Sequence, residues 1–280
     1  MKQPRLLRHA RGSIQALSQN AAHNIAARHA LVHYPSDTVY SFIPKNGCTT
    51  LRVAFAMGNG TVTGAEDFHW IHANNGTFRA SLRELASARA TFVVLRCPFR
   101  RLASAFLDKI VARSQEFWTL HRHTRDGLDA ARFTFAEFAG MMAKTPVRTL
   151  DIHWRPQVDF LVYEDYDRWF ALERLSDALP EIEAMLGHEV LDSRNFAGHD
   201  TGGLEVMEPG DHAQLTVSEL SRLREEGRVP AHADLYDDAL REVVTTAYAK
   251  DVALYAARFG AEGLAFPKAA DHPAVRKAAV

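Results

Sequence analysis

The sequence predicts a three-layer α/β fold with a central parallel sheet flanked by helices and a helix-rich C-terminal half. Two short runs of β-branched and aromatic residues, at 38–43 and 91–95, are each followed by a helical pattern of apolar residues. This order is typical of βαβ units, in which helices join parallel strands. Hydrophobic residues make up 47% of the 280 residues, which is enough to form a packed core.

The other predicted elements divide the chain into three regions. Residues 1–37 form an N-terminal extension, and 38–260 form a single folded domain. Within this domain the apolar periodicity predicts a further strand at 160–163 and helices at 172–186, 217–224 and 239–259. Residues 261–280 are rich in Ala, Pro and Lys and are predicted to be a flexible tail.

The N-terminal extension is basic, since no acidic residue precedes Asp37. Its positive charges are Lys2, Arg5, Arg8, Arg11 and Arg28. A solvated helical extension is the first interpretation. Apolar residues near helical spacing also allow a weak contact with a membrane surface or an acidic partner.

Charge and cysteine content exclude several classes of protein. The formal charge is −1, from 33 basic and 34 acidic residues, so no global attraction to nucleic acid is expected. Cys48 and Cys97 lack the spacing of a metal site or a disulfide framework, and a reducing compartment fits them best. No apolar run approaches the roughly 20 residues that span a bilayer, and no signal-peptide pattern is visible. We therefore expect a soluble, cytoplasmic protein.

The segment 40–50 is the first candidate anion site. It runs Tyr-Ser-Phe-Ile-Pro-Lys-Asn-Gly-Cys-Thr-Thr, which is typical of a buried strand, a glycine-containing turn and a helix that opens on two hydroxyl residues. A helix N-terminus presents unpaired backbone N–H groups and partial positive charge. Lys45 adds a full positive charge beside them.

This turn is P-loop-like but differs from the Walker A motif. In that motif the lysine immediately precedes the Ser or Thr that opens the helix. Here Lys45 comes two residues before Gly47, and no strand ending in a clear magnesium-binding aspartate follows. ATP hydrolysis is therefore the less favoured interpretation.

A second strand–helix junction supplies another candidate anion site. Arg96 follows the strand at 91–95, Pro98 suits the first turn of a helix, and Ser104 lies two turns further on. An arginine and a hydroxyl group placed in this way can hold one phosphate. Two anion sites on neighbouring strand ends predict a ligand with two separated phosphate-like groups.

These motifs resemble those of the carbohydrate sulfotransferase family that includes the chondroitin and HNK-1 sulfotransferases. The matching segments cover roughly residues 38–258 and are Pro44 to Thr50, Arg96 to Ala105, Asp151 to Gln157, Tyr166-Asp167 with Glu173, and Tyr248 with Asp251. Members of that family use 3′-phosphoadenosine 5′-phosphosulfate (PAPS), and for this chain we expect no metal to be required.

The resemblance implies specific donor contacts. The first loop would wrap the 5′-phosphosulfate, while Arg96 and Ser104 would hold the 3′-phosphate. The loop residues are Lys45, Asn46, Gly47, Cys48, Thr49 and Thr50.

Sulfuryl transfer also needs a base for the acceptor hydroxyl and positive charge near the departing phosphate oxygen. Lys45 is the candidate for the charge. His72 is the first candidate for the base, because it precedes Arg96 as the catalytic histidine does in related sulfotransferases. His153 is the alternative base, or a residue that shapes the acceptor site.

The sequence therefore predicts a PAPS-dependent sulfotransferase that acts by in-line displacement on a hydroxyl acceptor, with a carbohydrate expected. Two alternatives stay open at this point. One is a P-loop small-molecule kinase or NTPase, and the other is a non-catalytic relative that binds a nucleotide or a glycan.

Overall fold

The computed structural model describes residues 5–74, 76–125, 127–192 and 203–279. The chain divides into two compact units. The first contains the described residues up to Leu95 and those of 157–192, and the second contains Arg96–Pro156 and the described residues from 203 onward. The domain boundaries that the sequence suggests at 37/38 and 260/261 stay predictions. Lys2 of the basic extension lies outside the described residues.

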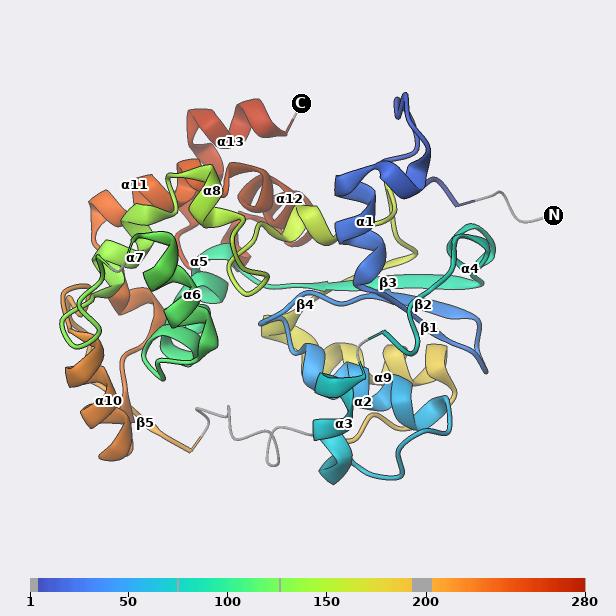
Figure 1. The fold of residues 1–280 in the computed structure, drawn as a ribbon, viewed down its shortest axis with the longest axis horizontal. Coiled ribbons are helices and arrows are strands. Elements are labelled where there is room, and N and C mark those ends of the chain that lie inside the picture. The colour runs from blue at the N-terminus through green and yellow to red at the C-terminus, as the bar shows by residue number, and fades with distance from the viewer. Residues whose placement is uncertain (1–4, 75, 126, 193–202, 280) are drawn as a thin grey trace. The chain divides into compact units, whose positions relative to one another are not determined.

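A four-stranded, mostly parallel sheet forms the centre of the first unit (Figure 1). Its strands lie in chain order: β1 (Ala30–His33), β2 (Thr38–Ser41), β3 (Ala90–Leu95) and β4 (Arg168–Ala171). β1 runs antiparallel to β2, whereas β2, β3 and β4 are parallel. The predicted mixed α/β class is thus confirmed. β1 is a strand that the sequence did not predict, since its residues lie in the predicted N-terminal extension.

Helices cover both faces of this sheet. The first unit contains α1 (Ala21–Arg28), α2 (Cys48–Gly58), α3 (His69–Ala73), α4 (Leu82–Ser87) and α9 (Leu175–Leu186). Figure 1 shows α2 and α9 on one face and α1 on the other. Tyr40 and Phe92 from the strands pack in one buried cluster with Phe55 of α2 and Ile182 of α9. Burial of this apolar surface is the main force that joins α2 to the sheet.

The strand predicted at 160–163 is wrong. Gln157–Phe160 forms a 3-10 turn, and Tyr163 makes only an isolated bridge with Leu7. The fourth strand begins five residues later, at Arg168. The run 160–163 is apolar because all its side chains are buried, and periodicity alone does not separate a buried strand from a buried loop.

The regular secondary structure of the second unit is mostly helical. Its helices are α5 (Pro98–Ala105), α6 (Gln115–His123), α7 (Phe135–Met141), α8 (Thr145–Arg148), α10 (Val217–Glu225), α11 (Asp238–Ala247), α12 (Ala249–Phe259) and α13 (Pro273–Ala278). A π-helical turn, Phe106–Ile110, continues α5. A short parallel pair, β5 (Glu205–Val206) and β6 (Arg228–Val229), completes the unit. The helix predicted at 217–224 is confirmed, and the one predicted at 239–259 is two helices that meet at Tyr248.

The segment predicted to be a flexible tail forms regular turns in its described part. Ala261–Gly263 and Pro267–Asp271 are 3-10 turns, and α13 follows them. Val275 is only 3% exposed, so this short helix buries an apolar side chain. No helix in the described ranges is both long and apolar enough to cross a membrane.

A pair of neighbouring histidines, one of them buried, lies beside β1 in the first unit. His33 of β1 is 1% exposed, and its ring centroid is 5.3 Å from that of His188. Its Nδ1 lies 2.7 Å from Ser36 Oγ, whose hydroxyl donates to Thr38 Oγ1, so Nδ1 carries the proton. Burial, together with the neighbouring His188, lowers the pKa of His33 to about 4. A Cβ at Gly58 would collide with the His33 ring, so only glycine fits there.

We expect the free energy of unfolding to decrease between pH 7 and pH 5. The pKa of His33 is 6.5 when unperturbed and about 4 in the folded protein, so in that window the unfolded chain binds a proton that the folded chain excludes. The contribution of His33 at pH 5 should be a loss of about 2 kcal/mol, measured by urea denaturation at the two pH values.

The variant His33→Gln should lose this part of the pH dependence. His123→Gln, on the exposed end of α6, serves as the control and should keep it. A His33→Gln protein with the full pH dependence would show that another group is responsible.

Candidate functional site

The loop between β2 and α2 is the first candidate site. Two of its residues have left-handed backbone, Lys45 with a φ of 71° and Gly47 with a φ of 68°. Left-handed residues in such a loop can direct successive backbone N–H groups toward one point, which makes an anion-binding concavity. At Gly47 a Cβ would also come within 2.8 Å of the Leu172 side chain. The left-handed backbone therefore favours glycine at this position, and a Cβ would also force the Leu172 side chain to move.

Asn46 fixes this loop to the sheet. Its side chain is buried, and Nδ2 donates to the carbonyl oxygen of Val94 in β3 at 2.9 Å and to Gln157 Oε1 at 2.7 Å. Both amide hydrogens are thus engaged within the protein. The resemblance implies that Asn46 contacts the donor. Here, however, both its amide hydrogens and its backbone N–H are engaged within the protein, the latter with the carbonyl oxygen of Ile43 at 3.2 Å. The sequence gives Gln157 no role, although it ends the motif that starts at Asp151.

The helix that follows the loop links it to His72. The N-cap of α2 is Gly47, which has no side chain, and residues 48–50 form the first turn of the helix. Arg52, in the next turn, is buried and donates from Nη2 to the carbonyl oxygen of Ile71 in α3 at 2.5 Å. His72 follows Ile71 and is exposed. The predicted base therefore lies on a short helix that is tied to the helix of the anion loop.

Arg96 and Ser104, the predicted 3′-phosphate ligands, belong to the second unit. Arg96 precedes α5 and Ser104 lies in its last turn, and both are half-buried. Arg101 lies in the same helix, α5. It is only 2% exposed, and its guanidinium donates to the carbonyl oxygens of Arg155 at 2.7 Å and Ile152 at 3.1 Å. Arg101 therefore holds a loop.

That loop carries His153 and is held at further points. The buried indole of Trp154 donates from Nε1 to the carbonyl oxygen of Val147 at 2.9 Å. The hydroxyl of Tyr248, which is also buried, donates to the carbonyl oxygen of Trp154 at 2.7 Å. With Arg101 these contacts fix the backbone on both sides of His153. Such support is what a catalytic side chain needs to keep one orientation.

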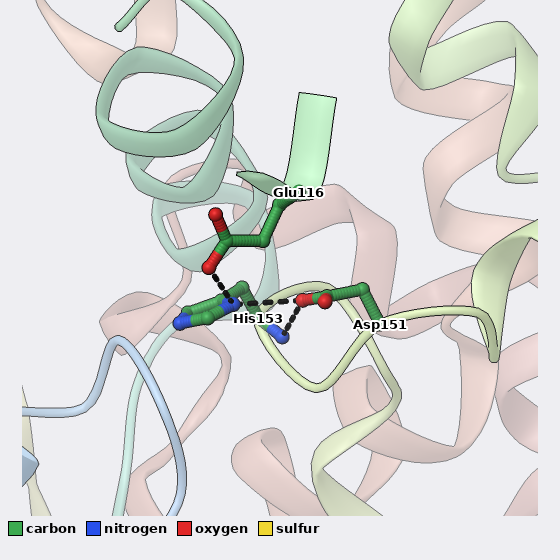
Figure 2. Close-up of side chains that lie close together, drawn as sticks. All are labelled: Glu116, Asp151 and His153. Carbon is green, nitrogen blue, oxygen red and sulfur yellow. Dashed lines mark hydrogen bonds and ion pairs between the residues drawn. The ribbon is translucent and has the colours of Figure 1, made fainter. Parts of the chain in front are cut away.

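His153 lies between two carboxylates (Figure 2). Its Nδ1 is 2.7 Å from Asp151 Oδ1 and 3.4 Å from Glu116 Oε1, and its backbone N–H donates to the same Asp151 oxygen at 2.9 Å. The side chains of His153, Glu116 and Asp151 are 19%, 18% and 20% exposed, so the cluster is partly open to solvent. Figure 2 shows the other ring nitrogen of His153 pointing away from both carboxylates.

Other charges surround this cluster. Lys109, in the π-helical turn, has its Nζ 3.3 Å from Asp108 and 3.9 Å from Glu116. Burial raises the pKa of Asp151, but the hydrogen bonds and charge of His153, with the charge of Lys109, outweigh it and lower that pKa overall. Ligand atoms of Glu116, Asp151 and His153 lie within 4.8 Å of one another, a spacing that cations also use. Because the Lys109 ammonium supplies positive charge there, we interpret the group as a hydrogen-bonded cluster.

Two further motif residues have structural contacts in the first unit. The hydroxyl groups of Tyr166 and Ser41 are hydrogen-bonded at 2.7 Å, next to the end of β2. Asp167 accepts a hydrogen bond from the backbone N–H of Thr91 in β3 at 2.7 Å. These residues therefore stabilise the strands that lead to the candidate sites.

The predicted site residues fall into two groups. Residues 45–50 and His72 belong to the first unit, and Arg96, Ser104 and His153 belong to the second. The carboxylate partners of His153 are not among the predicted residues. The Asp-x-His spacing is a local signal for Asp151, since a short polar side chain often bonds the backbone two residues on. Glu116 lies on another helix, so no local pattern marks it.

Comparison with known proteins agrees with these motifs. A family model described as the sulfotransferase family matches residues 28–256, which is well over half of the chain. Searches of curated proteins and of solved structures found no match. The family match extends over β1 to β4 and most of the second unit, including every predicted site residue. The chain therefore belongs to the sulfotransferase family.

Proposed function

We propose that this protein transfers the sulfuryl group of PAPS to a hydroxyl group of its acceptor. The anion loop supports this proposal most directly. It is left-handed at Lys45 and Gly47, stands at the N-terminus of α2, and is tied by Asn46 to the end of β3. In a chain of the sulfotransferase family, such a loop suits the phosphosulfate of the donor. We infer that the fold is the three-layer, P-loop-like one.

The two ends of the donor would have different ligands. The backbone N–H groups of residues 47–50 and the Lys45 ammonium take the 5′-phosphosulfate, while Asn46 holds the loop through its own hydrogen bonds. Arg96, the first residue after β3, and Ser104 take the 3′-phosphate, since a guanidinium and a hydroxyl are both donors suited to phosphate oxygens. No metal is required by this scheme, because the charge comes from side chains and backbone.

In the reaction, the acceptor oxygen attacks sulfur in line with the bond that breaks. The S–O bond to the 5′-phosphate cleaves, and the oxygen leaves with the phosphate as 3′-phosphoadenosine 5′-phosphate (PAP). Lys45 stabilises the charge that develops on this oxygen. A histidine accepts the proton of the acceptor hydroxyl. The contact between His153 Nδ1 and Asp151 supports His153 in this role, with His72 as the alternative.

A carbohydrate is the acceptor that we propose. This step rests on the motifs shared with carbohydrate sulfotransferases, above all the segment from Asp151 to Gln157. That segment carries His153, so the residues that resemble the carbohydrate enzymes are those beside the proposed base.

Ligand binding tests the donor assignment. PAP and PAPS should raise the melting temperature more than ATP with magnesium does, because ligands stabilise the native state that binds them. Arg96→Ala should weaken PAP roughly 10- to 100-fold, since a hydrogen bond to a charged group contributes about 1.5–3 kcal/mol. Affinity for adenosine 5′-phosphosulfate, which lacks the 3′-phosphate, should change little. Calorimetry with both ligands measures this difference.

The control for Arg96→Ala is Arg222→Ala, which removes an arginine of α10 that is 72% exposed. It should bind both ligands as the unchanged protein does. Equal weakening of both ligands by Arg96→Ala would contradict the 3′-phosphate assignment. Stabilisation by ATP with magnesium but not by PAP would favour the kinase alternative.

Lys45→Ala should lower kcat more than it raises the dissociation constant of PAPS. This pattern is expected of an interaction that is strongest in the transition state. Single-turnover kinetics and PAPS binding measured on the same preparation separate the two effects. A variant with normal kcat and weaker PAPS binding would make Lys45 a ground-state ligand only.

His153→Ala should lower kcat by about 10²–10⁴-fold, the usual contribution of a general base, while PAP still binds. His72→Ala should reduce turnover by a smaller factor. Rates for both variants under saturating PAPS, with PAP binding as the test of folding, decide between the histidines. Near-normal turnover in His153→Ala together with an inactive, folded His72→Ala would assign the base to His72.

A further inference from the structure

We propose that Asp151 is a positioning residue for His153, with Glu116 as an auxiliary carboxylate. Asp151 would keep the proton of the neutral imidazole on Nδ1, so that Nε2 is the atom that accepts the proton of the acceptor hydroxyl. This inference rests on the proposed sulfotransferase function and adds residues that the sequence did not predict.

The geometry of Asp151 specifies one tautomer. Its Oδ1 lies 2.7 Å from His153 Nδ1 and also accepts the backbone N–H of His153 at 2.9 Å. The pKa of Asp151 is lowered overall, so the carboxylate is ionised at neutral pH and can only accept. His153 Nδ1 must therefore carry the hydrogen in this contact. The lone pair of a neutral ring is then on Nε2.

The direction of the ring agrees with this role. Nε2 points away from both carboxylates, and the side chain of His153 is 19% exposed (Figure 2). Trp154 and Arg101 fix the backbone on either side through the contacts at 2.9, 2.7 and 3.1 Å described above. The imidazole is therefore held at its backbone and at Nδ1, and only Nε2 remains for an acceptor.

Glu116 places a second carboxylate near the same nitrogen of His153. Its Oε1 is 3.4 Å from His153 Nδ1, and its Oε2 accepts the hydroxyl of Ser114 at 2.6 Å. When the acceptor hydroxyl gives its proton to Nε2, the ring becomes an imidazolium. The two carboxylates, Asp151 and Glu116, stabilise that cation, and the nearby ammonium of Lys109, which is balanced by Asp108, opposes it only partly.

The tautomer is measured first, in the unchanged protein. Nitrogen NMR of protein labelled with ¹⁵N-histidine distinguishes a ring protonated at Nδ1 from one protonated at Nε2. The His153 signals are identified by their loss in His153→Gln. We expect neutral His153 to carry its proton on Nδ1, and to shift toward the Nε2 form in Asp151→Asn. A proton on Nε2 in the unchanged protein would overturn the proposal without any variant.

Activity gives the second measurement. Asp151→Asn should lower kcat by about 10²–10⁴-fold with little change in the KM for PAPS. The acidic limb of its pH–rate profile should move to lower pH, because one negative charge beside the imidazolium is lost. Glu116→Gln should lower kcat by a smaller factor and move the limb in the same direction. The matched control is Asp238→Asn on α11, whose side chain is 97% exposed, and it should leave both quantities unchanged.

The outcomes separate this proposal from the function on which it rests. A folded Asp151→Asn protein with kcat and acidic limb unchanged would overturn the positioning role, even if His153→Ala is inactive. Full turnover in His153→Ala would overturn the base assignment and with it this proposal, while leaving PAPS-dependent transfer intact. If Asp151→Asn does not fold, the tautomer of the unchanged protein and the pH–rate profile of Glu116→Gln decide the matter.

Discussion

The hydrogen bonds of one buried amide determine the geometry of the anion loop. Asn46 Nδ2 joins the loop to Val94 at the end of β3 and to Gln157 at the start of the segment that leads to β4. A loop with left-handed residues is costly unless its surroundings maintain it. The Asn46 contacts, and the close packing of Leu172 on Gly47, supply that support. The backbone of this loop is therefore held by contacts within the protein.

In the second unit a different set of buried side chains holds a loop in place. Here a buried guanidinium, an indole and a phenol all bond the loop that carries His153. Arg101 is 2% exposed, and burying such a charge is tolerable because its N–H groups meet carbonyl oxygens. Three residues of the family-like motifs thus have no need to touch a substrate. Their contacts hold the backbone on both sides of His153, the proposed base.

Much of the fold follows from local patterns. The runs at 38–43 and 91–95 correspond to β2 and β3, and the helix beginning at Pro98 is marked by its proline and apolar stripe. The pattern is ambiguous where burial is complete, which is why it places a strand wrongly at 160–163. β1 is not predicted because its four residues follow a basic segment and show little periodicity. They form a strand only because they pair with β2.

The two candidate anion sites can be read from local sequence, since each is a strand end followed by a helix and consists of consecutive residues. The family can be read from the sequence as well, because the motifs have a specific spacing. The contacts of Asn46, Arg101 and His153, in contrast, depend on how the chain packs. Their partners Gln157, Arg155 and Glu116 are far from them in the chain or on separate elements, and no local propensity encodes such a contact. Non-local hydrogen bonds form only when the chain has packed. Here they fix the orientation of the Asn46, Arg101 and His153 side chains.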